Sequence, residues 1–432
     1  MKLPAYPKYK TSGVEWLGDV PEKWEVKRLK YVAGLSDVKI EADPEMPVPY
    51  IGLEHVESWT GKLLPLDLEL VPSGIANQFK KGSVLFGKLR PYLAKACTPD
   101  FTGLCSTELL VLEAAKQDNR FLRYSLLTPG FISLVDSASY GVKMPRASWD
   151  FVGVCNLPLP PLPEQQIIAD FLDKETARLD ALVAKNAKLI ERLKEKRTAL
   201  LSHTVTRGLN SKAKLKSSGN DWLGDIPAHW EVLTVRHRAK LIKTGGTPPT
   251  AEERYYEDGT VPWFGPGSFD DQIVVSQPVK LLNSSAVKEG AARMFAAGAT
   301  MVVAIGATLG KVSSLTEPGS CNQQITVIEF DERRVHPRFA TYQLKRLEPA
   351  LRAIAPSATL PILDQGEIAD IAIGLPPLPE QTAIAEFLDA ETARIDDLVA
   401  KVETAVERLQ EYRTALITSA VTGKIDVRKE VA

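Results

Sequence analysis

The sequence predicts an α/β (α+β) fold with an approximate two-fold internal repeat. Two globular domains are expected, separated by two long helices that pair as an antiparallel coiled coil. The run Leu-Pro-Pro-Leu-Pro-Glu-Gln begins at Leu159 and returns 216 positions later at Leu375. The residues after each copy have a helical period. Each half also opens on Ser-Gly-x-x-Trp-Leu-Gly, at Ser12 and at Ser218.

Each copy of the repeated run leads into a segment whose apolar residues alternate at spacings of three and four, the pattern of a coiled-coil seam. Proline is absent from Glu164 to Lys214, so a single helix of about forty residues, roughly 60 Å long, is allowed. Alternatively, Asp173 and Asp389 cap a fresh helix after a short first one. The predicted pairing residues are Ile168, Leu172, Leu179, Leu182, Asn186, Leu189, Leu193, Leu200, Ile384, Leu388, Ile395, Leu398, Val402, Leu409 and Leu416.

Asn186 occupies a seam position at which the second copy has Val402. A single asparagine in a seam can fix the register of a coiled coil at some cost in stability, or the seam can simply be wet at that point. Both interpretations stay open. The mixed charges on the outer face of the first helix likewise fit either solvation or contact with a partner protein or a phosphate.

We expect globular domains at residues 1–157 and 211–373, and helical segments at 158–210 and 374–432. The domain openings are 206 positions apart, whereas Gly82 and Gly298 are 216 apart, so the second half carries ten extra residues between these points. Short apolar or β-branched segments bounded by Gly and Pro predict strands in both domains. Between the matched segments the sequences of the two halves diverge. A shared scaffold with unlike loops suggests that the two domains recognise different targets.

Composition predicts a soluble cytoplasmic protein. The chain is 44% hydrophobic and 25% charged, which is ordinary for a globular protein. No stretch approaches the ~18–20 apolar residues of a membrane span, and the N-terminus lacks the apolar core of a signal peptide. A net charge of −1 does not exclude DNA binding, because the local patch decides that. Cys105 and Cys321 lie at matched positions in strand-like runs and are expected in the core.

No catalytic or metal-binding motif is found. The segment Gly306 to Lys311 differs from a phosphate loop, because Ile305 stands where glycine is needed and Val312 stands where serine or threonine is needed. The cysteines and histidines lack the spacing of a zinc site. Catalysis is therefore not expected in this chain.

Basic, aromatic and hydroxyl side chains in loops punctuated by Gly and Pro are candidates for contact with DNA, because such side chains bind base edges and phosphates. For each of them, ordinary surface is the competing interpretation. The tryptophans fit the core better than base stacking. The candidates are Lys88, Arg90, Tyr92, Lys95, Tyr140, Lys143 and Arg146 in the first domain, and Lys243, Thr244, Thr247, Arg254, Lys311, Ser357 and Thr359 in the second.

Taken together, these motifs resemble the specificity subunit of type I restriction–modification systems over nearly the whole chain. The resemblance rests on the doubled openings, on the run Gly245-Gly246-Thr247-Pro248, on the doubled helices and on the ending Val421-Thr422-Gly423-Lys424-Ile425. One departure is Thr206-Arg207-Gly208-Leu209, where the second copy has Thr422-Gly423-Lys424-Ile425, and it affects only the linker.

The resemblance implies two target-recognition domains, each reading one half of a split, asymmetric sequence in double-stranded DNA. It implies that the helices set the unread spacer and dock two modification subunits, which bring S-adenosylmethionine and methylate adenine. Restriction subunits would add translocation and cleavage that depend on ATP and Mg. The resemblance assigns none of these cofactors to this chain.

Three other functions compete with this one. The chain could be a pure assembly scaffold, a DNA enzyme of unfamiliar type, or an orphan or methylation-only specificity protein. Divergent loops on a shared frame favour sequence reading over a scaffold, and the missing catalytic motifs disfavour an enzyme. The orphan and methylation-only variants differ from the first function only in their partner genes.

Overall fold

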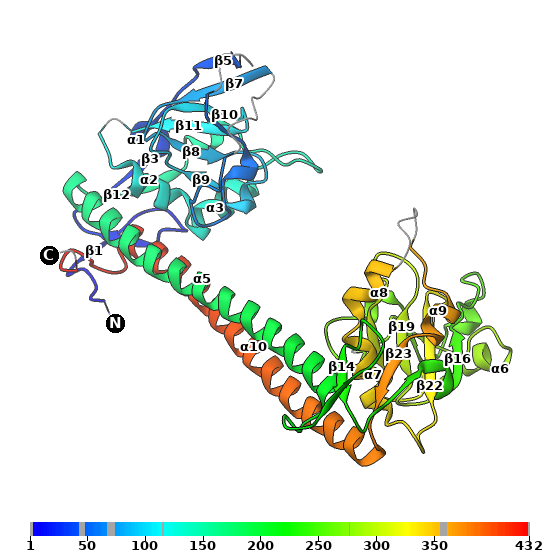
Figure 1. Cartoon of the computed structure of the whole chain (residues 1–432). Helices are drawn as coiled ribbons and strands as arrows, with labels where there is room; N and C mark the ends of the chain where they lie inside the picture. Colours follow the sequence, from blue (N-terminus) through cyan, green and yellow to red (C-terminus); the bar gives the residue numbers. More distant parts are fainter. Residues whose placement is uncertain are drawn as a thin grey trace. The chain divides into compact units, whose positions relative to one another are not determined.

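The computed structural model describes residues 3–42, 48–66, 74–114, 116–275, 277–354 and 361–430. The chain forms two compact units, one made of Met1–Lys188 with Glu403–Ala432 and the other of Leu189–Val402. The long helices α5 (Leu162–Arg207) and α10 (Leu378–Val421) each run through both units and lie side by side (Figure 1). Each repeat therefore contains one continuous helix, which is the longer of the two predicted possibilities.

The first unit contains sheets with strand orders β1-β2, β5-β7-β10-β6, β4-β11-β8-β9 and β12-β3. Its strands are β1 (Tyr9–Thr11), β2 (Asp19–Pro21), β3 (Glu25–Arg28), β4 (Gly34–Leu35), β5 (Lys39–Ala42), β6 (Tyr50–Ile51), β7 (Gly74–Phe79), β8 (Val84–Gly87), β9 (Ala96–Cys97), β10 (Gly103–Cys105), β11 (Leu109–Glu113) and β12 (Asn156–Leu159). Its shorter helices are α1 (Leu29–Val32), α2 (Asn119–Leu126), α3 (Pro129–Ser137) and α4 (Trp149–Val152), with 3-10 turns η1 (Leu53–His55) and η2 (Pro91–Leu93).

The sheet β4-β11-β8-β9 separates two apolar cores. Successive side chains of a strand point to opposite faces. In β8, Val84 and Phe86 accordingly pack with α2 and α3, whereas Leu85 packs in the core shared with β10. The first domain is thus a layer of helices, a central sheet and a second sheet.

The second unit repeats this architecture with orders β13-β14, β15-β23, β16-β22-β19-β20 and β18-β17-β21. Its strands are β13 (Leu215–Ser217), β14 (Asp225–Pro227), β15 (Glu231–Thr234), β16 (Ala239–Thr244), β17 (Val261–Phe264), β18 (Lys280–Leu282), β19 (Thr300–Val303), β20 (Val312–Ser314), β21 (Ser320–Cys321), β22 (Ile325–Phe330) and β23 (Ala372–Leu375). Its helices are η3 (Val235–His237), η4 (Glu253–Tyr255), η5 (Pro266–Ser268), α6 (Ser284–Lys288), α7 (Pro337–Lys345), α8 (Glu348–Ile354) and α9 (Gln365–Ala369). Three of the four strand orders match those of the first unit and confirm the predicted internal repeat, whereas the sheet β18-β17-β21 has three strands where β5-β7-β10-β6 has four.

A matched hydrogen bond ties the start of each long helix to its own domain. The indole N–H of Trp24 donates to Glu164 Oε1 at 3.1 Å, and that of Trp230 donates to Glu380 Oε1 at 3.2 Å. Both tryptophans are buried, at 1% and 0% exposure, as the sequence predicted. A buried indole N–H needs an acceptor. The repeated Trp and the repeated Glu are therefore two halves of one contact.

The glutamine after each of these glutamates makes a second anchor and has no exposed surface. Gln165 Oε1 accepts the backbone N–H of Asp118, the N-cap of α2, at 3.0 Å, and Gln381 Oε1 accepts that of His336, the N-cap of α7, at 2.8 Å. Both side-chain amides donate to the carbonyl five residues earlier, at 2.8 Å in each case. Helix and domain thus share a satisfied polar contact inside each unit.

Asp173 and Asp389 accept hydrogen bonds from buried tyrosines instead of capping a second helix. Tyr124 Oη donates to Asp173 Oδ1 and Tyr342 Oη donates to Asp389 Oδ1, both at 2.7 Å. Burial raises the pKa of Tyr124 to about 12, so its phenol stays protonated and donates at physiological pH. The aspartate therefore occurs in both repeats because, in each unit, it accepts a hydrogen bond from a tyrosine of the globular domain.

The two long helices pack antiparallel, and a repeat-matched ion pair in each unit marks their register. Asp180 pairs with Arg413 Nε at 3.0 Å in the first unit, and Asp396 pairs with Arg197 Nε at 2.9 Å in the second. Moving 17 residues forward on α5 corresponds to moving 17 residues back on α10. The predicted antiparallel pairing is confirmed.

The buried stripe of these helices differs from the predicted seam at alternate positions. Leu182, Leu189 and Leu398 are exposed, at 37%, 43% and 41%, so they do not lie on the stripe. From Leu179 onward, the buried stripe advances by four residues and then by three, whereas the predicted seam advances by three residues and then by four. The stripe is made of buried or half-buried residues, namely Ile168, Leu172, Thr176, Leu179, Val183, Asn186, Ile190, Leu193, Arg197, Leu200 and Thr204 on α5, and Ile384, Leu388, Thr392, Ile395, Val399, Val402, Val406, Leu409, Arg413, Leu416 and Ala420 on α10.

None of the helices in the described part of the chain combines the length and apolar character needed to cross a bilayer.

All four cysteines are buried and free, which confirms the core role expected of Cys105 and Cys321. Burial raises the pKa of Cys97, Cys105 and Cys321 to about 12 and that of Cys155 to about 11.

Because the thiolate is the reactive form, we expect no alkylation of the native protein by iodoacetamide at pH 8, and alkylation of all four cysteines in denaturant. Mass spectrometry checks this, and a rapidly labelled native cysteine would contradict it.

Candidate nucleic-acid interface

The basic loop after β8 begins at one end of the central sheet of the first domain. Lys88 follows β8 directly, and Arg90 takes the left-handed conformation with φ 51°. Such a conformation is strained for a residue with a side chain, so the surrounding structure has to hold it. The Arg90 N–H donates to the carbonyl of Pro145 at 2.7 Å, which joins this loop to a second one.

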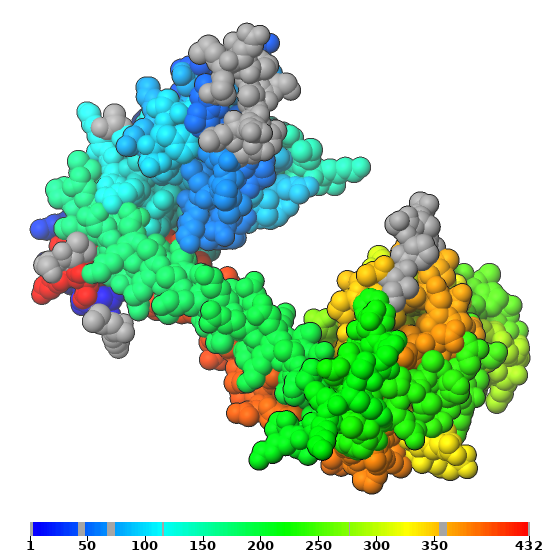
Figure 2. Space-filling view, in the orientation of Figure 1, coloured from blue at the N-terminus to red at the C-terminus, as the bar shows by residue number. Residues whose placement is uncertain are grey.

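That second loop, residues 140–146, forms a projection that we call the finger. Tyr140 and Arg146 exchange both backbone hydrogen bonds, at 3.1 and 3.0 Å, and so close the base of the loop. Gly141 has φ 102°, which only glycine adopts without strain. Figure 2 shows the finger as a teal projection from the first domain. The sequence placed Tyr140, Lys143 and Arg146 together, and the structure brings them close to Lys88 and Arg90.

A bidentate ion pair holds the finger in place. Arg146 Nη2 lies 2.9 Å from Glu108 Oε1, and Arg146 Nε lies 3.0 Å from both carboxylate oxygens. Hydrogen bonding to Glu108 raises the pKa of Arg146, which keeps the guanidinium charged. The pairing makes Arg146 a positioning residue for the finger in this structure. Its predicted contact with DNA stays a prediction.

A hollow of about 260 Å³ lies at the base of the finger. Three of the predicted residues line it, namely Lys88, Tyr140 and Arg146, together with Lys39 and Asn77, which the sequence did not single out. Among the described residues, the ammonium group of Lys88 has no hydrogen-bond or ion-pair partner. Tyr140 is 65% exposed. As far as the described residues show, this corner of the first domain therefore offers an unpaired cation beside exposed aromatic surface.

Two of the predicted lysines are occupied by matched structural bonds. Lys95 donates to the carbonyl of Leu53 at 2.7 Å, and Lys311, 216 positions later, donates to the carbonyl of Phe269 at 3.1 Å. Leu53 and Phe269 are themselves 216 positions apart. A bond that occurs in both domains belongs to their shared frame. Lys95 and Lys311 consequently hold a loop to the sheet.

In the second domain, the strand β16 ends in Lys243 and Thr244. A Cβ on Gly245 would overlap the carbonyl oxygen of Cys321, so only glycine allows the chain to pass there. The next predicted residue, Thr247, donates to the side chain of Gln323. The run Gly-Gly-Thr-Pro therefore crosses close over the β21–β22 turn and turns the chain away from the sheet.

Arg254 lies in a separate cluster, where two carboxylates already pair with it. Its Nη2 is 2.9 Å from Glu252 and 2.8 Å from Glu289. The hydrogen bond from Tyr255, followed by that from Arg254, holds the pKa of Glu289 below its usual range. The predicted contacts Ser357 and Thr359 fall outside the described residues.

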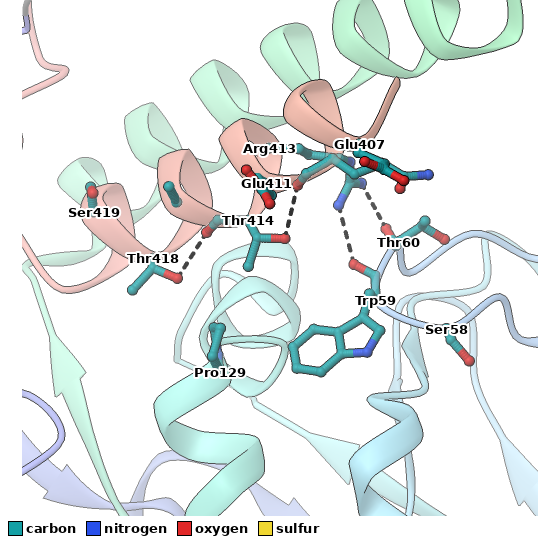
Figure 3. Close-up of a pocket in the computed structure, with 12 residues that line it drawn as sticks. Ser58, Trp59, Thr60, Pro129, Glu407, Glu411, Arg413, Thr414, Thr418 and Ser419 are labelled. Carbon is teal, nitrogen blue, oxygen red and sulfur yellow. Dashed lines mark hydrogen bonds between the residues drawn. The ribbon is translucent and has the colours of Figure 1, made fainter. Parts of the chain in front are cut away.

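A groove of about 920 Å³ runs along the C-terminal half of α10 in the first unit. Trp59 and Thr60 form one side, Pro129 closes the base, and α10 contributes Glu407 and Glu411 (Figure 3). Trp59 has φ 65°, a left-handed conformation in a residue with a bulky side chain. Neighbouring residues must therefore hold the backbone of this loop in its strained conformation.

Arg413 supplies that support. Its guanidinium donates to the carbonyls of Trp59 at 3.1 Å and Thr60 at 3.0 Å (Figure 3). Its Nε pairs with Asp180. Lys62 also reaches Asp180, at 2.9 Å. The first domain is thus joined to both long helices within its own unit.

A family model, the type I restriction modification DNA specificity domain, matches the chain twice, over residues 21–192 and 227–408. The chain belongs to this family. Each match contains most of one globular domain and most of one long helix, so the repeat found in the structure is the family domain itself.

Individual members of the family and solved structures are similar to this chain over most of its length. The type I restriction enzyme MjaVIII specificity subunit of Methanocaldococcus jannaschii is 23% identical over 438 residues, which cover 95% of this chain and 94% of the relative. A chain solved under the description "Structural basis underlying complex assembly and conformational transition of the type I R-M system" has a TM-score of 0.74 at 20% identity, covering 93% of this chain and 98% of its own length. The HsdS subunit from Thermoanaerobacter tengcongensis has a TM-score of 0.51 at 21% identity, with 94% and 98% covered. The two structures support the fold.

Sequence reasoning missed Glu108, Asn77 and Arg413. The first two are single residues whose partners are distant in sequence, so no local pattern marks them. For Arg413 the sequence does contain a signal. Arg197 and Arg413 are the first residues of the repeated run Arg-Thr-Ala-Leu, at a helix position that is buried or half-buried in the structure. A repeated charge beside an apolar stripe predicts a buried ion pair.

We expect Arg413→Ala to lower the stability of the first unit by about 3 kcal/mol, because it leaves the carbonyls of Trp59 and Thr60 without this donor and removes one of the two cations that pair with Asp180. Hydrogen exchange at Trp59 to Lys62 should rise with it. The matched control is Arg197→Ala, which loses only the pair with Asp396 and should cost about 1 kcal/mol. Equal effects of the two substitutions on thermal unfolding would contradict this assignment.

Proposed function

We propose that this chain is the non-catalytic subunit that directs a type I restriction–modification complex to a bipartite, asymmetric target in double-stranded DNA. Each globular domain reads one half of the target. The observation that carries the proposal is the pair of domains with one frame and unlike loops. The frame bonds of Lys95 and Lys311 coincide, whereas the finger of the first domain projects where the second domain has a different sequence.

The charges of the first domain suit a nucleic acid. Lys88, Arg90 and Lys143 lie within or beside the finger, and Arg146 neutralises the neighbouring carboxylate, Glu108. Phosphates position a protein on a duplex, and base edges specify the sequence. We assign Lys88 and Lys143 to phosphates and the remaining residues of the finger to base edges.

The paired helices serve in this proposal as spacer and docking platform. Two modification subunits bind them and bring S-adenosylmethionine for adenine methylation, and restriction subunits add translocation that uses ATP and Mg. Exposed leucines at Leu182, Leu189 and Leu398 offer apolar contacts on the outer faces of the helices. The groove of the first unit adds an acidic rim, Glu407 and Glu411, suited to a basic segment of a partner.

The test of sequence reading is genome-wide mapping of methylated adenine after co-expression with a modification subunit. We expect a split motif of two short halves with a fixed gap. Replacing residues 211–373 with those of another specificity subunit should change one half, and replacing residues 1–157 should change the other. A stable complex that binds DNA without preference would overturn the proposal in favour of an assembly scaffold.

The spacer role predicts a change of gap without a change of halves. We would delete seven residues of α5 between Asp180 and Arg197, and the repeat-matched seven of α10 between Asp396 and Arg413, which keeps both ion pairs. The helices then shorten by about 10 Å, equivalent to about three base pairs. The methylated motif should keep its halves and lose about three base pairs of gap. An unaltered gap contradicts the spacer role.

A further inference from the structure

The finger carries an apolar tip that no described part of the chain covers. Val142 is fully exposed, at 102% of its reference surface, and its neighbours Tyr140 and Met144 are 65% and 49% exposed. Single exposed apolar residues are ordinary on protein surfaces, whereas a cluster of them on a projection indicates a binding surface. Three such residues within five positions form this cluster.

The tip is held rigidly even though it is exposed. Besides the bonds at its base, the finger receives a hydrogen bond from Arg90 Nη2 to the carbonyl of Lys143 at 3.3 Å, next to Val142. The clamp between Arg146 and Glu108 fixes the same C-terminal arm of the finger three residues further along. A loop ordered before binding loses little entropy on binding, so weak contacts at its tip can contribute fully to affinity.

The surroundings of the tip select its partner. Lys88, Arg90 and Lys143 give the finger positive flanks. The partner must therefore combine negative charge with a small apolar spot. The major groove of B-DNA is lined by phosphates, admits a two-stranded ribbon, and presents the C5-methyl group of thymine as its apolar feature.

The size of Val142 favours contact over insertion. Residues that wedge between stacked bases include phenylalanine, leucine, isoleucine and methionine, whose side chains reach further than that of valine. The two methyl groups of valine branch directly from Cβ, so they form a short, blunt tip. A blunt apolar tip matches a methyl group on the groove floor.

We propose that Val142 specifies a thymine in the half-site read by the first domain, by packing its methyl groups against the C5-methyl in the major groove. This inference rests on the proposed function and adds to it a residue, a base and a chemical group. An adenine-methylated half-site contains at least one thymine, opposite the target adenine, so every such target offers the contact.

The experiment removes the C5-methyl group from the DNA side of the contact and the two γ-methyl groups of Val142 from the protein side. Once the methylated motif is known, each thymine of the first half is replaced singly by deoxyuridine, which lacks only the C5-methyl. Binding of the complete methyltransferase complex is then measured for the wild type and for Val142→Ala. We expect one position at which deoxyuridine weakens wild-type binding about fourfold, the effect of losing one buried methyl group.

Val142→Ala should bind the unmodified target at least fourfold more weakly and should be indifferent to deoxyuridine at that position. Val154→Ala, which changes a 38% exposed valine elsewhere in the same domain, is the matched control and should behave as the wild type. Deoxyuridine in the half read by the second domain should affect all three proteins equally.

Two results overturn the inference alone. One is a wild-type complex that prefers its target but binds every deoxyuridine duplex equally well. The other is a Val142→Ala complex that is weakened yet keeps its sensitivity at every thymine, which would place the tip against another feature of the duplex or against a partner subunit. A wild-type complex with no preferred sequence would overturn the proposed function itself, and this inference with it.

Discussion

A buried side-chain amide at the start of each long helix supports the rest of the structure. Gln165 and Gln381 have no exposed surface. Burying an amide without hydrogen-bond partners would destabilise the fold by more than the packing of its side chain stabilises it. Each amide accepts the N–H that begins a domain helix and donates to the carbonyl five residues earlier. These bonds form only when the long helix leaves its domain in one direction. The adjacent Trp–Glu contact reinforces that direction.

Features encoded locally or by repetition could be predicted from the sequence. The internal repeat, the continuous helices and the antiparallel pairing follow from matched runs and helical spacing. The seam was misplaced at Leu182 and Leu189 because apolar residues also stand one position further on, at Val183 and Ile190. Two adjacent apolar residues satisfy both spacings, and only the packing of the second helix decides between them. The stripe also contains Thr176 and Arg197, which an apolar count passes over.

The candidate site was predictable in part. Loop composition pointed to Lys88, Tyr140 and Arg146, which line one hollow. Composition could not show that Lys95 and Lys311 are held by carbonyls, since their acceptors lie more than forty residues away. Nor could it show that Glu108 occupies Arg146. Charge in a loop suggests availability, and the tertiary partners determine which charges are free.

The matched ion pairs have a consequence for symmetry. Asp180 pairs with Arg413 as Asp396 pairs with Arg197, so each helix presents the same self-complementary surface to the other. A self-complementary surface is the interface of a two-fold homodimer. The chain is in this sense a dimer fused into one polypeptide. A true homodimer presents two identical readers and is confined to palindromes. Under the proposed function, fusion removes that restriction, because a substitution in one domain is not copied into the other.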